Sequence, residues 1–198
     1  MSTAKRFMLP LIVASAMISP ALASDTWDID SAHSSARFSV RHMMISNVNG
    51  QFSKVSGKVE YDGKALDKAK VDATIPVGTV NTQEPGRDEH LRGKDFFDAA
   101  AFPDMTFKSK KIVTDKDGFK IYGDLTLHGV TKEVVLQADP LAKPIKDPKG
   151  KTRIGASATG KINRKDFGIS FNKAMDNGGA MVGDDVKITL DVELVKEG

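Results

Sequence analysis

One segment of the sequence gathers most of the side chains that could do chemistry. Residues 84–92 contain three acids, two arginines and a histidine, and two adjacent phenylalanines follow at positions 96 and 97. The guanidinium groups of Arg87 and Arg92 could hold a phosphate or another polar head group, because arginine binds such oxygens through paired hydrogen bonds. His90 could act there as a general acid or base, although no partner nucleophile is evident.

The same segment also has a structural interpretation. Asp88, at the start of a short helix, can cap free N–H groups or pair with Arg92 four residues later. We favour this interpretation for Asp88. It leaves open whether Arg87, His90 and Arg92 lie at the mouth of a binding site.

The remaining candidate ligands predict no metal or cofactor site. The four histidines, at positions 33, 42, 90 and 128, share no metal-ligand spacing. A haem held by His42 and a methionine is conceivable, but the chain has no C-x-x-C-H motif. The chain has no cysteine at all, which excludes a disulfide scaffold, a thiol nucleophile and Cys-ligated metal centres.

The first 23 residues have the features of a secretory signal peptide. A basic start at Lys5 and Arg6 precedes an apolar stretch over residues 7–18, and Ala21-Leu22-Ala23 forms a cleavage motif. The apolar stretch is shorter than the roughly 20 residues that a membrane-spanning helix needs. We therefore expect cleavage between Ala23 and Ser24, and an exported, soluble protein with a single domain at residues 24–198.

The charge of the expected mature chain is nearly balanced. Cleavage removes two of the 29 basic residues and leaves 27 against 26 acidic residues. A chain without a broad basic surface is not expected to bind nucleic acid.

The elements that position the candidate residues are predicted to be β-strands. Apolar and polar residues alternate from residue 36 onward, which is typical of antiparallel strands with one buried face. A hairpin is indicated by the Asp117-Gly118 turn. We predict eight strands and one short helix over 88–97, with a long loop at 163–185. The strands are expected near 36–42, 53–61, 71–77, 105–110, 119–127, 134–138, 152–162 and 186–195.

Eight antiparallel strands with one continuous apolar face favour an all-β barrel that can hold one small ligand, with a two-sheet sandwich as the alternative. Several small residues recur on the inward face, among them Gly57, Ala73 and Ala156. They would leave an apolar cavity unless bulky neighbours such as Phe38 and Phe107 fill it. The pattern leaves both possibilities open.

Several blocks of the chain resemble the YceI-like family, in the order in which the family has them. They run from about Trp27 to Leu194 and are specific in combination. The blocks are Trp27-Asp28-Ile29-Asp30 with His33-Ser34 and Phe38, residues 87–92 with Asp95-Phe96-Phe97, residues 102–109, residues 123–132 and residues 160–168.

The resemblance implies an extended, eight-stranded, antiparallel, lipocalin-like β-barrel that is exported to the bacterial periplasm. It also implies that a polyisoprenoid or a related, quinone-like long-chain lipid is the ligand, without a further cofactor, and that a homodimer can form. Loops at 43–50 and 171–185 are where family members differ. The residues expected beside the ligand are Phe38, Val40, His42, Val55, Ile75, Arg87, His90, Leu91, Arg92, Phe96, Phe97, Phe107, Leu125 and Phe167.

We therefore expect a non-enzymatic protein that binds such a lipid, carries or stores it, and contacts membranes transiently. Two alternatives remain open. An enzyme could modify the lipid, with His90 as acid or base and Arg87 or Arg92 stabilising negative charge. A stress-related structural protein could instead have an interior that its own side chains fill.

Overall fold

The computed structural model describes residues 24–175 and 179–198. The expected signal peptide, with Ala23 on one side of the cleavage site, lies outside the described residues, and Ser24 is exposed directly before the first strand. No helix in the described ranges is both long and apolar enough to cross a membrane. The strands are β1 (Asp25–Ile29), β2 (Ser35–His42), β3 (Ser46–Phe52), β4 (Ser56–Tyr61), β5 (Lys70–Pro76), β6 (Asp104–Asp115), β7 (Gly118–Leu127), β8 (Val130–Ala138), β9 (Ile145–Lys146), β10 (Thr152–Asn163) and β11 (Val182–Lys196). The helices are the 3-10 turns η1 (Leu66–Lys68), η2 (Val77–Thr79) and η3 (Arg164–Phe167), and the α-helix α1 (Pro85–Arg92).

Eight of the strands close into an antiparallel barrel. Their order is β11-β1-β4-β5-β6-β7-β8-β10, and β10 pairs again with β11. The eight-stranded antiparallel barrel predicted from the sequence is therefore confirmed. Its ring contains β1, which was not predicted, in place of the predicted strand at 36–42, which is β2 and pairs with β11 and β3 outside the ring. The two-sheet sandwich is excluded, because the ring of hydrogen-bonded strands returns to its starting strand.

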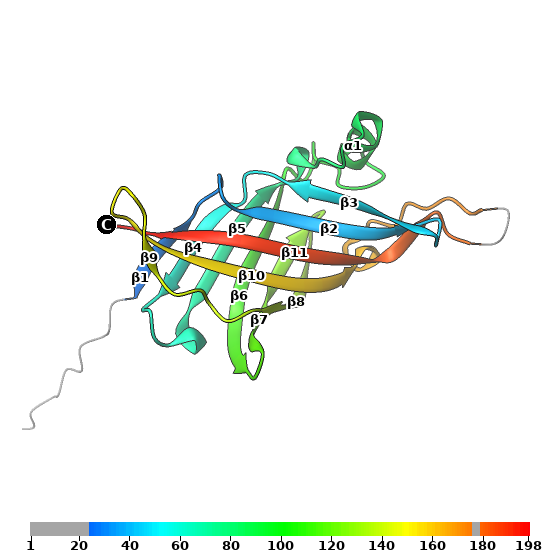
Figure 1. Cartoon of the computed structure of the whole chain (residues 1–198). Coiled ribbons are helices and arrows are strands. Elements are labelled where there is room, and N and C mark those ends of the chain that lie inside the picture. Colours follow the sequence, from blue (N-terminus) through cyan, green and yellow to red (C-terminus); the bar gives the residue numbers. More distant parts are fainter. Residues whose placement is uncertain (1–23, 176–178) are drawn as a thin grey trace, which may run out of the picture.

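The long strand β11 gives the barrel its extended shape. Its last residues, from Leu194 to Lys196, pair with β1, whereas its residues 182–191 pair with β2. β2 pairs in turn with β3 from Ala36 to His42. The β2–β3 hairpin thus continues the wall past β1 and β4, and its tip lies at the end of the molecule opposite the C-terminus (Figure 1).

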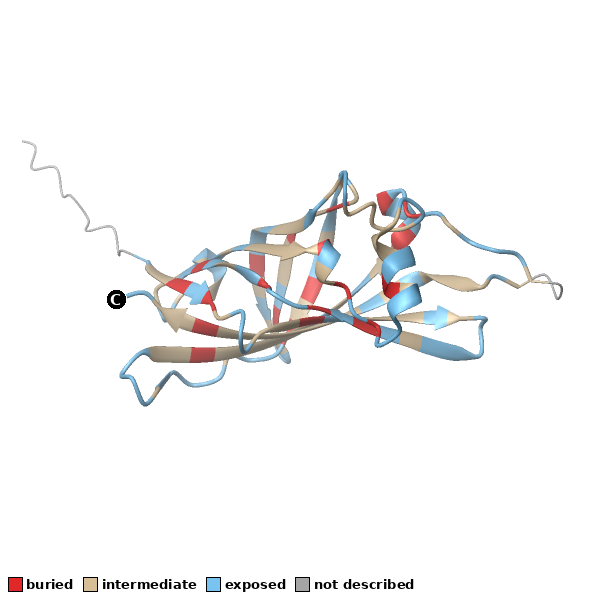
Figure 2. Cartoon of the chain, turned by 90° about the horizontal axis from the view of Figure 1, so that it is seen from above, coloured by how far each residue is buried: buried red, intermediate tan, exposed pale blue. Residues whose placement is uncertain are grey.

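The alternation read from the sequence directs the apolar side chains inward. In the β6–β7 hairpin, for example, Phe107 lies opposite Leu125, and both border the interior. Buried residues are spread along the barrel (Figure 2) in three separate clusters, around Trp27, beside α1 and around Phe119. The interior is therefore an extended apolar space and not one compact core.

Several expected boundaries are wrong in detail, and β6 and β8 are both longer than expected. The segment 43–50, expected to be a loop, contains the first part of β3, whose polar residues Ser46, Asn47 and Asn49 hide its strand character but whose backbone pairs with β2. The expected loop 163–185 contains η3 and the start of β11. The strand expected from residue 53 begins only at Ser56, because Lys54 has a φ of 62° and interrupts the extended chain.

The helix begins earlier than expected. We predicted it over 88–97, but α1 begins at Pro85, a residue suited to the first helical position because it lacks an N–H to leave unpaired. The carboxylate of Glu84 accepts hydrogen bonds from the backbone N–H groups of Gly86 and Arg87 and caps the helix. Asp88 is therefore not the N-cap and is available for another contact.

Candidate functional site

The barrel encloses an apolar cavity of about 280 Å³. Every strand except β9 contributes to its lining, and α1 contributes Leu91. Aromatic side chains gather at the α1 side, where the ring of Phe52 lies 5.6 Å from that of Phe38 and 5.5 Å from that of Phe97, between centroids. Small residues on β5 and β10, including Ala73, Ala156 and Ala158, leave the space that these larger side chains do not fill.

Most of the residues expected beside a ligand border this cavity. The structure brings together nine of them, contributed by strands, by α1 and by the segments next to them. They are Phe38, Val40, Val55, Ile75, Leu91, Phe96, Phe97, Phe107 and Leu125.

Two other expected residues are apolar or aromatic but do not line the cavity. Phe167 is almost fully buried, at 1% exposure, and packs in the cluster beside α1 as a core residue. His42 is the last residue of β2, where it pairs with Ser46 and Val182 at the end of the hairpin.

The side chain of Arg87 makes its hydrogen bonds within the protein and does not border the cavity. Its Nε donates to the hydroxyl of Thr82 at 2.7 Å, and its Nη2 donates to the Thr82 carbonyl at 3.0 Å. Asp88, which is buried, accepts from the amide and the hydroxyl of the same threonine. This corrects the expected pairing of Asp88 with Arg92, since Asp88 joins α1 to the segment that precedes it.

His90 and Arg92 also have protein partners. Nε2 of His90 lies 2.9 Å from a carboxylate oxygen of Asp95, and its ring packs edge-on against Phe96 and Phe171 with 5.0 Å between centroids. Arg92 donates to Glu89. Neither residue borders the cavity, so the structure does not bring the charged residues of this segment together around the apolar space.

Sequence reasoning missed Arg164, a buried arginine at the border of the cavity. Its guanidinium donates five hydrogen bonds, to the carbonyl oxygens of Ile169, Phe171, Val182 and Gly183 and to the carboxylate of Asp184. Burial lowers the pKa of Arg164, which the neighbouring Asp184 partly offsets. All its donors are occupied, so this arginine fixes the chain between η3 and β11 and has none left for a ligand.

Sequence reasoning also missed Tyr61, which differs from Arg164 in the hydrogen bonding of its polar group. Strand alternation places Tyr61 on the inward face of β4 with Val59, and both border the cavity. Its hydroxyl makes no hydrogen bond within the described residues, and desolvation raises the pKa of the phenol. The other polar residues of the lining, Arg37, Thr106 and Ser157, alternate with inward residues and stand on the outer face of their strands. Tyr61 is thus the one inward side chain of the described lining that carries a polar group without a hydrogen-bond partner in the protein.

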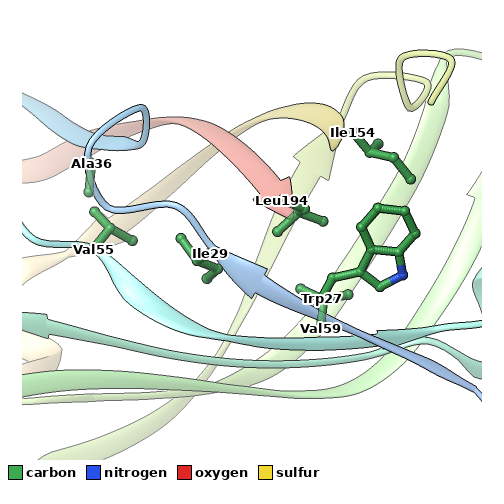
Figure 3. Close-up of a cluster of buried hydrophobic side chains, with 7 residues drawn as sticks. All are labelled: Trp27, Ile29, Ala36, Val55, Val59, Ile154 and Leu194. Carbon is green, nitrogen blue, oxygen red and sulfur yellow. The ribbon is translucent and has the colours of Figure 1, made fainter. Parts of the chain in front are cut away.

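Tyr61 lies at the end of the barrel that is closed by Trp27. The indole N–H of Trp27 donates to the Tyr61 carbonyl at 3.1 Å, and the ring is buried with Val59, Ile154 and Leu194 (Figure 3). Among the lining residues near this end, Val55, Leu66, Ala69 and Leu141 belong to the segments that connect the strands. The remaining lining residues at this end belong to strands.

A network of ion pairs around Arg153 lies on the outer side of the same end of the barrel. Arg153 donates to Asp30 at 2.7 Å and to Asp147 at 2.8 Å, and it also contacts Glu193. Hydrogen bonds from Arg153 and then from His33 hold the pKa of Asp30 far below its usual range. Ligand atoms of Asp30, His33 and Glu193 lie within 4.8 Å of one another, as in a metal site. The guanidinium of Arg153 already occupies the carboxylates, so the group is an ion-pair network.

Known proteins share this architecture. UPF0312 protein SA2479 of Staphylococcus aureus is 37% identical over 164 residues, which cover 83% of this chain and 94% of that protein. The crystal structure of the Campylobacter jejuni YCEI protein is 31% identical, with a TM-score of 0.67 and coverage of 96% of this chain and 100% of that one. A polyisoprenoid binding domain from Saccharophagus degradans has the same fold, with a TM-score of 0.62 at 16% identity, and covers 86% of this chain and 98% of that one.

The family model described as the YceI-like domain matches residues 27–194. This range begins at the tryptophan that closes one end of the barrel and ends within β11, which completes the ring. The chain belongs to the YceI-like domain family.

Proposed function

We propose that this protein binds a long-chain isoprenoid, such as a polyisoprenoid or quinone-like lipid, inside the barrel and carries or stores it. The observation that carries the proposal is the cavity of about 280 Å³, whose inward lining in the described residues is apolar apart from Tyr61 and Arg164. Its size is near the lower end of known ligand pockets, which measure roughly 300–1,000 Å³.

The chemistry of the lining favours a hydrocarbon chain. Each methylene moved from water into such a site contributes about 0.8 kcal/mol, so a long chain binds tightly with few polar contacts. A polar ligand would instead leave its hydrogen-bonding groups unpaired among residues such as Phe107, Leu125 and Ile188.

The polar end of the ligand is proposed to meet Tyr61. The phenol can donate a hydrogen bond to a carbonyl, hydroxyl or phosphate oxygen. Arg164 cannot replace it in this role, because its five hydrogen bonds are already made within the protein.

Family membership supports a binding role, and the Saccharophagus degradans domain with this fold is named for polyisoprenoid binding. The proposal includes export to the periplasm after cleavage before Ser24. An intact mass corresponding to a chain that begins at Ser24, measured on protein from the periplasmic fraction, tests this part.

The proposal is for binding without catalysis. His90, the residue considered as an acid or base, is paired with Asp95, packs against Phe96 and Phe171, and does not border the cavity. Prolonged incubation of the protein with its bound lipid should therefore return the lipid chemically unchanged, whereas a modified product that His90→Ala fails to form would contradict the proposal.

The first experiment is native mass spectrometry of protein purified from its own periplasm, followed by extraction and identification of the adduct. We expect a stoichiometric long-chain lipid, and the same spectrum counts subunits and tests for a homodimer. A protein that is empty and also refuses added isoprenoid would contradict the proposal.

A pair of variants on one strand tests the location of the ligand. Phe107→Asp places a charge in the cavity, whereas Lys111→Asp changes an exposed residue of the same strand, β6. We expect only the former to lose the adduct, with folding of both checked by circular dichroism. Full retention of the lipid by a folded Phe107→Asp protein would show that the barrel interior is not the site.

A further inference from the structure

The tip of the β2–β3 hairpin presents three consecutive apolar side chains to solvent. Met43, Met44 and Ile45 are 39%, 56% and 76% exposed. Other large exposed apolar residues among those described, Val135 and Ile145, occur singly. We name residues 43–45 the apolar tip.

The backbone of the apolar tip has an unusual conformation. Met43 and Met44 have φ values of 49° and 62°, a region that large side chains rarely adopt. The turn is closed by a hydrogen bond from the Ile45 N–H to the His42 carbonyl at 3.1 Å, and Arg41 donates to the Met44 carbonyl at 3.0 Å. Asparagine or glycine would fit this turn with less strain, so its stability does not explain the two methionines.

The hairpin that carries the apolar tip has basic residues and no acidic one. The two acidic residues at the facing start of β11, Asp184 and Asp185, are paired with Arg164, Lys165 and Lys161. No acidic residue occurs between positions 31 and 59, a range that includes the whole hairpin. The N–H of Met43 donates to the Met181 carbonyl, and the N–H of Met181 donates to the Lys173 carbonyl, so Lys173 lies on the chain beside the tip. Arg41 and Lys173 are exposed and have no ion pair within the described residues.

The apolar tip extends from the wall of the cavity. Val40 and Val182 border the cavity, and Val182 pairs with His42 directly before the tip. At about 3.3 Å per residue, Met43 follows Val40 by roughly 10 Å along the strand direction. The end of the barrel that includes β1 and the C-terminus lies opposite the tip (Figure 1).

We propose that the apolar tip inserts into the surface of an anionic lipid bilayer, with Arg41 and Lys173 at the phosphates, and so places this end of the barrel against the membrane. The purpose of the contact, exchange of lipid with the cavity, rests on the proposed function. A narrow tip of three residues suits the bilayer interface, because a stable protein partner would need roughly 800 Å² on each side. Basic residues beside apolar ones are the combination that binds anionic membranes.

The test is binding of the chain that begins at Ser24, which contains every described strand of the barrel, to vesicles without isoprenoid. Because the chain has no cysteine, Ile45→Cys and Ile145→Cys each accept a single environment-sensitive fluorophore. Ile145 is a matched control, since it is 63% exposed and lies on β9, which pairs with the opposite end of β10. On phosphatidylglycerol vesicles, we expect a blue shift from the label at position 45 and none from that at 145.

Three variants without a label complete the test. Met44→Asp with Ile45→Asp should lower vesicle affinity at least tenfold in flotation assays, whereas Ile145→Asp should leave it unchanged. Arg41→Ser should weaken binding to anionic vesicles about fivefold. Equal binding by the double variant, no vesicle binding by the unaltered chain, or a shift at position 45 only on adding a protein extract would each overturn the proposal.

Failure of this proposal and failure of the proposed function are distinguishable. Displacement of a fluorescent fatty probe in solution, without vesicles, measures the cavity alone. The tip variants should retain normal probe binding, because residues 43–45 do not line the cavity.

Discussion

Asp88 and Thr82 are joined by two hydrogen bonds, in which the Thr82 amide and hydroxyl both donate to Oδ1 of Asp88, at 2.7 and 2.6 Å. Both residues are buried, and Arg87 donates to Thr82 from the other side. The charged motif at the start of α1 therefore ties the helix to Thr82, and the neighbouring Asn81 is hydrogen-bonded to Gln51 of β3. These contacts connect the helix that carries Leu91 to the wall of the barrel.

Removal of this carboxylate should destabilise the fold. In Asp88→Ala, two buried donors of Thr82 lose their acceptor, and we expect the free energy of unfolding to fall by about 1–3 kcal/mol. Urea denaturation measures the change. Glu89→Ala is the matched control on the next residue, with an 81% exposed side chain, and should change stability by less than about 0.5 kcal/mol. Equal stability of the two variants would contradict the structural role.

The network at the other end should make stability depend on pH. The pKa of Asp30 is lowered in the folded protein by hydrogen bonds from Arg153 and His33, whereas the unfolded carboxyl titrates near 3.8. A lowered folded pKa means that the interaction stabilises the fold above the unfolded pKa and is lost as the pH falls toward the folded pKa. We therefore expect stability to fall as the pH drops below about 4, and Asp30→Asn to show a shallower fall.

Urea midpoints measured between pH 2 and 6 provide the measurement. The slope of the free energy of unfolding against pH reports how many more protons the unfolded state binds than the folded state. This number should differ by less than one between Asp30→Asn and the unaltered protein, because a single group is removed. Asp28→Asn serves as the control, since Asp28 is 53% exposed and makes no contact with Arg153. An Asp30→Asn curve as steep as that of the unaltered protein would exclude Asp30 as a source of acid sensitivity.

The alternation of apolar and polar residues predicted which side chains face the interior of the barrel, but it did not predict strands with many polar residues. Phe107 and Leu125 could be placed inward because a period of two leaves one face of β6 and β7 apolar. The same reasoning failed for β3, where Asn47 and Asn49 break the pattern and only pairing with β2 defines the strand.

The charged residues were harder to predict because their roles depend on partners far from any local pattern. Arg87 looked available for a ligand, and nothing in the sequence marked Thr82 as its acceptor. Arg164 lies in a segment without periodicity, and its five acceptors come from backbone between residues 169 and 183 and from Asp184. Tyr61 could have been noticed, since it is a polar residue at the end of an apolar face that includes Val59.

The free hydroxyl of Tyr61 leads to a prediction about selectivity. If it donates to the polar end of the ligand, Tyr61→Phe should weaken binding of an isoprenoid alcohol or quinone about two- to tenfold, the range expected for one hydrogen bond. Affinity for a hydrocarbon of the same length should not change. Tyr122→Phe is the control, since Tyr122 does not border the cavity. Competition with a fluorescent probe gives both affinities, and an equal effect on alcohol and hydrocarbon would exclude the hydrogen bond.

A bulky side chain placed in the cavity tests whether the cavity is space for a lipid chain. Ala156 borders the cavity from β10, and Ala156→Phe should shorten the longest isoprenoid that fits. Each excluded methylene costs about 0.8 kcal/mol, so loss of two carbons lowers affinity at least tenfold for a twenty-carbon isoprenoid, with less effect on a ten-carbon one. Thr159→Phe, on the exposed face of the same strand, should change the affinity for neither isoprenoid.

In a filled interior, by contrast, Ala156→Phe would overpack the core and lower the free energy of unfolding by about 1–3 kcal/mol. Ligand affinity and urea stability of the two variants thus separate a binding cavity from a packed core.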